Sequence, residues 1–292
     1  MKEGAQARGH GIRVAYGQLV WQVLFYSVPL CLLIAMSLWI TRNYQPVPAL
    51  TFANYSAILR APRYLAALGE SLALGFHAAN LAVFLGYPAA HALRHHVPAS
   101  RRSLILVLFL TPWFSSYLVR VLACQAALSR SGLSLGPGRL LAEFWGTEIL
   151  YTEKAVLIGL VSILLPVSVI LIYGSLARLD DTSIAAAKNL GAGRFMIFMR
   201  LELPLAVPGL IAAYVFTSIL AFSDFVSVSI LGGNNTYFIS TAIHDRIKIS
   251  DWPQAAALGT MALGVASLLA GSGFALGSRM LAGVRKSGGA RF

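Results

Sequence analysis

The chain has 292 residues, of which 57% are hydrophobic and only 12% are charged, and its formal net charge is +12. Soluble domains hold about twice that charged fraction, so the composition is typical of a protein that lies in lipid. The basic residues stand mainly between apolar segments. Membrane topology therefore explains them better than nucleic-acid binding does, and we expect no nucleic-acid partner.

Six apolar segments are long enough to cross a bilayer, because about 20 apolar residues span it as a helix. Helices satisfy every backbone donor and acceptor inside the lipid, so we predict an all-α, polytopic membrane protein with six transmembrane helices. Arg120 interrupts the third segment and Asp224 interrupts the fifth. The segments are Leu19–Ile40, Ser71–Ala92, Ser103–Leu128, Ala155–Leu176, Leu205–Leu231 and Ala255–Ser278.

The distribution of Lys and Arg predicts the orientation of these helices. With the N-terminus in the cytoplasm, 14 of the 23 basic residues fall on the cytoplasmic side and 8 on the outer side. We therefore predict both termini inside, with cytoplasmic tails at 1–18 and 281–292. The first helix and its outer loop occupy 19–68, and one transmembrane domain occupies 69–280 and contains an inner loop at 177–204.

Three outer connections are too short to form domains but long enough for short amphipathic helices on the membrane surface. They are Thr41–Glu70, Ser129–Lys154 and Gly232–Gln254.

The inner loop at 177–204 has the sequence signals of a helix–turn–helix. Asp180–Ser183 offers N-cap residues, and an alanine-rich helix is expected over Ile184–Leu190. Gly191 suits the left-handed conformation that ends such a helix. A second short helix should follow, and Pro204 should end it. This pattern alone also fits an ordered loop that packs against the bundle, and both interpretations stay open at this point.

The residues of this loop resemble those of a known family. The run from Ala185 to Leu210, AAAKNLGAGRFMIFMRLELPLAVPGL, resembles the loop of ABC-importer permeases, whose pattern is Glu-Ala-Ala, three residues, Gly, and later Ile-x-Leu-Pro. Further pieces look like the spermidine/putrescine-type branch of the type I importers. They are Asn54-Tyr55, Gly86-Tyr87-Pro88-Ala89-Ala90, Ser116-Tyr117-Leu118-Val119-Arg120, and Phe225 through Leu231-Gly232-Gly233.

The resemblance implies the type I ABC importer fold and a bacterial inner-membrane location. It implies as partners two ATP-binding cassette subunits, a second and related permease subunit, and a solute-binding protein. It also places the contact with the ATPase on the inner loop, although the family's glutamate falls on an alanine, Ala185, in this chain. The implied coupling residues are Ala185, Ala186, Ala187, Gly191, Ala192, Phe195 and Pro204.

This chain has no catalytic site that its sequence reveals. It contains no Gly-x-x-x-x-Gly-Lys-Ser/Thr sequence, so we expect ATP and Mg²⁺ to bind partner subunits and expect no cofactor in this chain. No serine or histidine stands in a recognisable nucleophile setting, which argues against an intramembrane enzyme.

Polar and aromatic side chains in the third and fifth segments are candidates for the solute path. Asp224 could contact a cationic solute such as a polyamine, or it could form a structural ion pair with Arg120. The aromatic residues could line a gate, since aromatic faces hold cations, or they could serve helix packing or an interface belt. These aromatic residues are Trp113, Tyr117, Phe222 and Phe225.

Three histidines, His91, His95 and His96, stand near the end of the second segment. His91 and His95 are one helical turn apart, as two metal ligands could be. Because no Cys, Asp or Glu accompanies them in the sequence, we expect a solvated interfacial patch and no metal site.

Other functions remain as alternatives. A secondary transporter should show an internal inverted repeat or broken helices in corresponding halves, and the sequence shows neither. A membrane scaffold would not need Asp224 or Arg120 inside a span. Within the importer hypothesis, the solute could instead be an amino-acid derivative, an opine or a metal.

Overall fold

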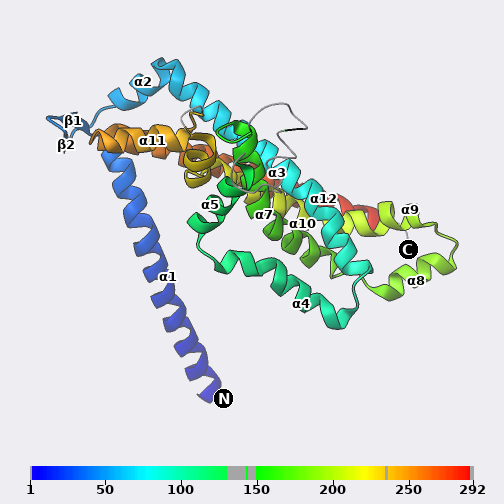
Figure 1. Cartoon of the computed structure of the whole chain (residues 1–292). Coiled ribbons are helices and arrows are strands. Elements are labelled where there is room, and N and C mark those ends of the chain that lie inside the picture. The colour runs from blue at the N-terminus through cyan, green and yellow to red at the C-terminus, as the bar shows by residue number, and fades with distance from the viewer. Residues whose placement is uncertain (1, 130–142, 144–148, 234–235, 290–292) are drawn as a thin grey trace. The chain divides into compact units, whose positions relative to one another are not determined.

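The computed structural model describes residues 2–129, 143, 149–233 and 236–289, and it is almost wholly helical (Figure 1). Among these residues, five helices are long and apolar enough to cross a membrane, and a sixth span results if one bent pair is counted as one. The polytopic all-α architecture is thereby confirmed. The direction in which the chain crosses the membrane stays a prediction.

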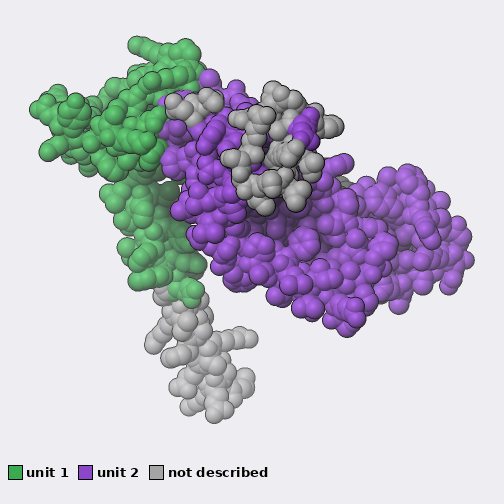
Figure 2. Space-filling view, in the orientation of Figure 1, with its two compact units in different colours: residues 1–65, 242–263 green, residues 66–241, 264–292 purple. Residues whose placement is uncertain are grey.

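Two compact units make up the chain, and Figure 2 colours them separately. The first contains residues 1–65 and 242–263, and the second contains residues 66–241 and 264–292. We describe each by itself.

The first unit begins with α1 (Lys2–Ser37) and continues through an antiparallel hairpin of β1 (Ile40–Arg42) and β2 (Gln45–Val47) to α2 (Ala53–Arg60). The tight turn of the hairpin places two residues at positive φ, a conformation that suits a two-residue turn. No part of the 18-residue apolar window of α1 is buried, so its side chains are free to face lipid.

The predicted outer connections contain short helices, as expected. The first holds α2, and the last holds all of α11 (Ile239–Lys248). The middle connection, Ser129–Lys154, lies largely outside the described residues.

The second unit packs its helices around α7 (Glu153–Leu176), which carries no charge between Ala155 and Leu176. The other long helices that contribute to this unit are α3 (Pro62–His95), α10 (Leu203–Phe222) and α12 (Trp252–Gly289). One hydrophobic cluster surrounds the first half of α7, and a second surrounds Val169, Ile172 and Leu176 in its last half. Each end of α7 therefore has its own core.

Glycine lets helices approach closely at two places in this unit. A Cβ on Gly86 of α3 would lie 2.7 Å from the Ser168 hydroxyl of α7, and a Cβ on Gly273 of α12 would overlap the Val215 side chain of α10. Both approaches are closer than real Cβ contacts, so a larger residue at either position would force the neighbouring side chain or helix to shift.

The third predicted span is not one straight helix. It consists of α4 (Ala99–Leu110), a 3₁₀ turn η1 (Thr111–Phe114) and α5 (Tyr117–Leu128), and the two parts are bent by 92°. The break follows Pro112, which lacks a backbone donor, and the chain is extended at Ser115. Arg120, which interrupts the apolar run in the sequence, lies within α5 and does not break it.

The fifth predicted span, Leu205–Leu231, is also wrong as one continuous helix. Its main helix ends at Phe222, and a separate π-turn, η3 (Val228–Gly232), follows after Ser223 and Asp224. Asp224 accepts the backbone N–H of Ser227 at 3.1 Å, so its carboxylate caps the start of the second piece.

Candidate functional site

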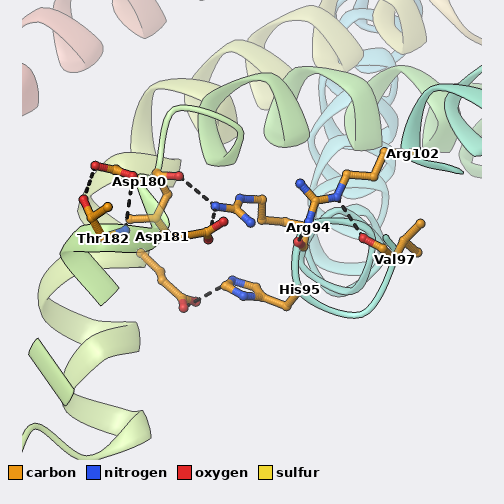
Figure 3. Close-up of polar contacts among 9 residues, drawn as sticks. Arg94, His95, Val97, Arg102, Asp180, Asp181 and Thr182 are labelled. Carbon is orange, nitrogen blue, oxygen red and sulfur yellow. Dashed lines mark hydrogen bonds and ion pairs between the residues drawn. The ribbon is translucent and has the colours of Figure 1, made fainter. Parts of the chain in front are cut away.

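The inner loop begins with α8 (Asp181–Asn189), which starts three residues earlier than predicted and ends one residue earlier. Asp180 caps it, as expected, by accepting the backbone N–H of Thr182 at 3.2 Å (Figure 3). A second bond from the Thr182 hydroxyl, together with this backbone bond, lowers the pKa of Asp180. The cap is thus built from residues adjacent in sequence.

A complete Schellman turn ends α8 at the predicted glycine. Gly191 has φ +81°, its N–H donates to Lys188 O at 2.9 Å, and the N–H of Ala192 donates to Ala187 O at 3.0 Å. These two bonds satisfy carbonyls that the last turn of a helix leaves open. The predicted role of Gly191 in the geometry of the loop is confirmed.

The second helix of the loop does not end at Pro204. Instead α9 (Arg194–Ile197) runs through a π-segment, η2 (Phe198–Glu202), directly into α10, which gives one helical stretch of 29 residues from Arg194 to Phe222. Pro204 stands in the first turn of α10, where its missing N–H and its ring are tolerated because the wider π-segment precedes it.

The surface of this loop exposes small and apolar residues, together with the basic side chains of Lys188 and Arg194. Ala185, Ala186 and Gly191 are exposed, and nothing lies within 4 Å of a Cβ placed on Gly191. Leu190 is 89% exposed and Phe195 is 74% exposed. Two large apolar side chains thus flank a patch of small residues, which is the arrangement expected of a face that another protein covers.

Arg94 anchors α8 to α3, a contact that the sequence analysis missed. Its side chain is buried and donates to Leu179 O at 2.8 Å and to the Asp181 carboxylate at 2.6 Å (Figure 3). An arginine at the end of an apolar span is a signal that the sequence does offer, although its burial is seen only in the structure. Its partners stand 85 and 87 residues away, however, so the sequence does not identify them.

The two helix breaks come together around Tyr117 and Asp224. The Tyr117 hydroxyl donates to the Asp224 carboxylate at 2.8 Å and lies 2.9 Å from the Ser227 hydroxyl. A pocket of about 280 Å³ lies against this pair, and its lining also includes Trp113, Arg120, Leu220, Ser223 and the middle of α7. Three of the predicted path residues, Trp113, Tyr117 and Arg120, therefore share one cavity with Asp224.

Arg120 does not form the direct ion pair with Asp224 that the sequence suggested as one alternative. Its guanidinium lies over the rings of Trp113 and Tyr117, 5.4 Å and 5.5 Å from their centroids. Tyr117 thus stands between the two charges. Arg120 Nε and Nη1 are buried and have no hydrogen-bond partner among the described residues.

The predicted aromatic residues differ in their surroundings. The Trp113 indole donates to Ile163 O at 3.0 Å, which holds the break in the third span against α7. Phe222 is buried and Phe225 is half-buried, and neither lines the pocket.

The histidines at the end of α3 have an acidic neighbour, contrary to the expectation from the sequence. Glu202, which is buried in η2, lies 3.0 Å from His91 and 3.3 Å from His95. The contact joins residues 111 positions apart, so nothing near the histidines in the sequence indicates it. His96 is exposed.

Comparison with known proteins gives concordant results. The family described as "Binding-protein-dependent transport system inner membrane component" matches residues 7–280. The spermidine/putrescine transport system permease protein PotB of Escherichia coli K12 is 33% identical over 248 residues, covering 81% of this chain and 86% of PotB. PotC, a spermidine/putrescine transport system permease protein of the same strain, is 26% identical and covers 87% of this chain and 89% of PotC.

A similar fold occurs in a solved structure. A bacterial ABC transporter involved in the import of the acidic polysaccharide alginate contains a chain that superposes with a TM-score of 0.74. The match covers 96% of this chain and 99% of that chain at 16% sequence identity. This likeness concerns the fold.

Proposed function

The chain belongs to the family of binding-protein-dependent transport system inner membrane components, and we propose that it forms the path for a small cationic, polyamine-like solute. It is a permease subunit of an ABC importer in the inner membrane, and it is not an enzyme. The partners of an ABC importer work with it. The finer points, which are the docking site, the stoichiometry and the solute, are our proposals.

The assembly that we propose contains two ATP-binding cassette subunits, a solute-binding protein and a second, related permease. PotB and PotC are two related permease proteins named for one transport system in one organism, which favours a pair of different permeases here. ATP and Mg²⁺ bind to the ATPase subunits, because this chain has no phosphate-binding loop.

The loop of α8 and α9 is the proposed docking element for an ATPase subunit. The observation that carries this proposal is the exposed patch of small residues between Leu190 and Phe195 at a fixed turn. Movement imposed on α9 would pass directly into α10, because the helix is continuous from Arg194 to Phe222. At 1.5 Å per residue this stretch extends over about 40 Å and ends beside Asp224.

A cross-linking experiment tests the docking proposal. Leu190→Cys, in a background with Cys31 and Cys124 replaced by Ser, should form a cross-link to the ATPase subunit in the assembled importer. Leu268→Cys on α12 is 74% exposed as well and serves as the matched control, which should give no such product. Equal cross-linking from both positions, or from Leu268 alone, would contradict the proposal.

The pocket at Tyr117 and Asp224 is the proposed contact site for the solute. Irregular backbone at membrane depth occurs where protein buries it or where it lines a cavity, and two helix breaks meet at this pocket. The Asp224 carboxylate supplies negative charge, and the rings of Trp113 and Tyr117 supply faces that attract cations. A polyamine carries positive charge, which the carboxylate and the aromatic rings attract.

One observation favours a second candidate solute, an amine that also carries a carboxylate. The buried Nε and Nη1 groups of Arg120 have no partner among the described residues. A carboxylate is the group that an arginine fork binds best. Arg120 and Asp224 together could therefore hold the two ends of an amino-acid derivative.

A ligand screen of the partner binding protein separates these candidates, and uptake assays then connect the result to this chain. Polyamines should bind, and their uptake should fall in Asp224→Asn more than in Arg120→Gln. Binding of carboxylated amines in place of polyamines, with the larger loss in Arg120→Gln, would favour the second candidate. An uncharged ligand would contradict both.

A further inference from the structure

A cluster of two histidines and one glutamate joins α3 to η2, the π-segment that leads from the docking loop into α10. Tyr87, His91 and His95 are spaced four residues apart, so their side chains stand one above another on one face of α3. That face meets Glu202, whose side chain is 8% exposed.

The distances within the cluster are those of atoms that converge on one point. His91 Nε2 lies 3.0 Å from Glu202 Oε2, and His95 Nε2 lies 3.3 Å from Glu202 Oε1. One ligand atom from each of the three residues lies within 4.8 Å of the other two. Each histidine thus faces a different oxygen of the same carboxylate.

His95 is close to Glu202 but is not hydrogen-bonded to it. Its Nε2 is within ion-pair distance, yet the atom is buried and makes no hydrogen bond of acceptable geometry among the described residues. The Tyr87 hydroxyl, one turn before His91, is also buried without a partner in that set. Two buried polar atoms without partners in one cluster indicate a missing ion or water molecule that both atoms could contact.

The two arginines near the cluster, Arg94 and Arg102, form their hydrogen bonds with other groups. Arg94 directs its guanidinium to Leu179 O and Asp181, and Arg102 donates to Val97 O and Arg94 O (Figure 3). A cation placed between His91, His95 and Glu202 would therefore meet imidazole nitrogens and a carboxylate.

We propose that His91, His95 and Glu202 bind a divalent transition-metal cation, with Zn²⁺ as the best match. Two histidines at i and i+4 on one helix face, with a carboxylate from elsewhere in the fold, form a set of three ligands that suits zinc. Water or the Tyr87 hydroxyl can complete a tetrahedral site. Imidazole ligands argue against Ca²⁺ and Mg²⁺, which prefer oxygen.

A metal ion at this site would stabilise the connection between the docking loop and α10. The ion would tie α3 to the π-segment through which α9 continues into α10. π-segments within helices occur frequently at functional sites, and here the segment supplies a ligand. Bound metal should therefore stabilise the arrangement of α3 and α10, whatever the transported solute is.

Zinc titration of the full-length, tag-free chain in detergent tests the site directly, with a chromophoric chelator as the competitor. We expect about one Zn²⁺ per chain and an increase of the melting temperature on binding. His95→Ala and Glu202→Gln should each weaken binding by about tenfold or more and remove the thermal shift. His77→Ala removes an exposed histidine about four helical turns before His91 on α3, and this variant should bind zinc as the unmodified chain does.

His95→Gln keeps a polar side chain at the same position. It takes the place of His95→Ala if that variant does not elute as a folded protein. Unchanged affinity in the folded ligand variants would overturn the proposal. So would a loss in His77→Ala as large as that in His95→Ala, or the absence of zinc binding by the unmodified chain. None of these readouts involves transport or ATP, so their failure would leave the proposed function intact.

Discussion

The docking loop and the Asp224 pocket are built in opposite ways. The loop of α8 and α9 takes its shape from backbone rules, namely an Asp180 cap and a Schellman turn at Gly191, and it presents small and apolar side chains outward. The pocket takes its shape from side-chain contacts between two broken helices, with Tyr117 bonded to Asp224. A surface for a protein partner needs a rigid shape, whereas a surface for a polar solute needs charge inside the membrane.

The largest effect should come from neutralising the pocket. In Asp224→Asn the carboxylate that Tyr117 and the Ser227 N–H contact loses its charge, so a cationic solute loses its partner. Loss of one member of a desolvated charge contact costs about 2 kcal/mol or more, roughly a 30-fold loss in uptake. Uptake in proteoliposomes measures this.

Ser223→Ala is the matched control for that experiment, because Ser223 lines the same pocket and its hydroxyl bonds only within its own helix. Normal uptake in Asp224→Asn, or an equal loss in Ser223→Ala, would remove Asp224 from the solute path. Assembly of the importer should be the same in both variants.

The next largest effect should come from the turn of the docking loop. Gly191→Val forces a β-branched residue into φ +81°, which costs about 1–3 kcal/mol. We expect ATP hydrolysis to continue with little transport, because the docking face is displaced. The ratio of ATP hydrolysed to solute transported should rise.

Gly193→Val is the comparison for this prediction, because it adds the same side chain to the same exposed patch at a position without positive φ. Gly193 has φ −69°, a value that any residue adopts, and nothing lies within 4 Å of a Cβ placed there. Ala185→Glu should also keep coupled transport, since it restores the residue that the family pattern has at that position. Gly193→Val should uncouple less than Gly191→Val, and equal behaviour of the two variants would mean that the turn at Gly191 does not set the docking face.

A smaller effect is expected where α8 is anchored. Arg94→Met removes the charged bonds to Leu179 O and Asp181 and leaves that carbonyl without its donor. Bonds of this kind contribute about 2 kcal/mol when buried. Amide hydrogen exchange should become faster over α8 and stay unchanged over η3, whereas uniform exchange over both segments would contradict a local anchor.

The smallest effect concerns the cap of α8. Bonds from Thr182 lower the pKa of Asp180, so the cap contributes its full stability above the carboxyl's unperturbed pKa of 3.8. That contribution is lost as the pH falls through the lower value of the folded state. An NMR titration of the Asp180 carboxyl should give a midpoint below 3.8, and Asp180→Asn should abolish the transition. A midpoint above 3.8 would mean that the cap is not formed.

Features that depend on neighbouring residues could be predicted from the sequence. The cap at Asp180, the turn at Gly191 and the charge-free span of α7 each rest on local patterns. The family followed from short motifs in the right order, although each motif alone is weak. The predicted helix end at Pro204 was wrong because sequence rules do not anticipate the π-segment, Phe198–Glu202, after which the helix continues through Pro204.

Features that depend on distant residues could not be predicted. Glu202 meets His91, which stands 111 positions earlier, and also His95, and Tyr117 separates Arg120 from the Asp224 carboxylate. The breaks after Pro112 and Phe222 occur inside runs that are apolar enough to be straight spans. Pro112 and Asp224 mark the two bends locally, and both α5 and η3, which follow the bends, pack against α7.

ATP dependence of uptake tests the central claim most directly. The purified chain would be reconstituted in proteoliposomes with its second permease, its ATPase subunits and the solute-binding protein, and polyamine uptake would be measured with and without ATP. Our account predicts that the ATPase copurifies with the chain and that uptake stops without ATP. A chain that purifies without an ATPase and transports solute regardless of ATP would contradict it.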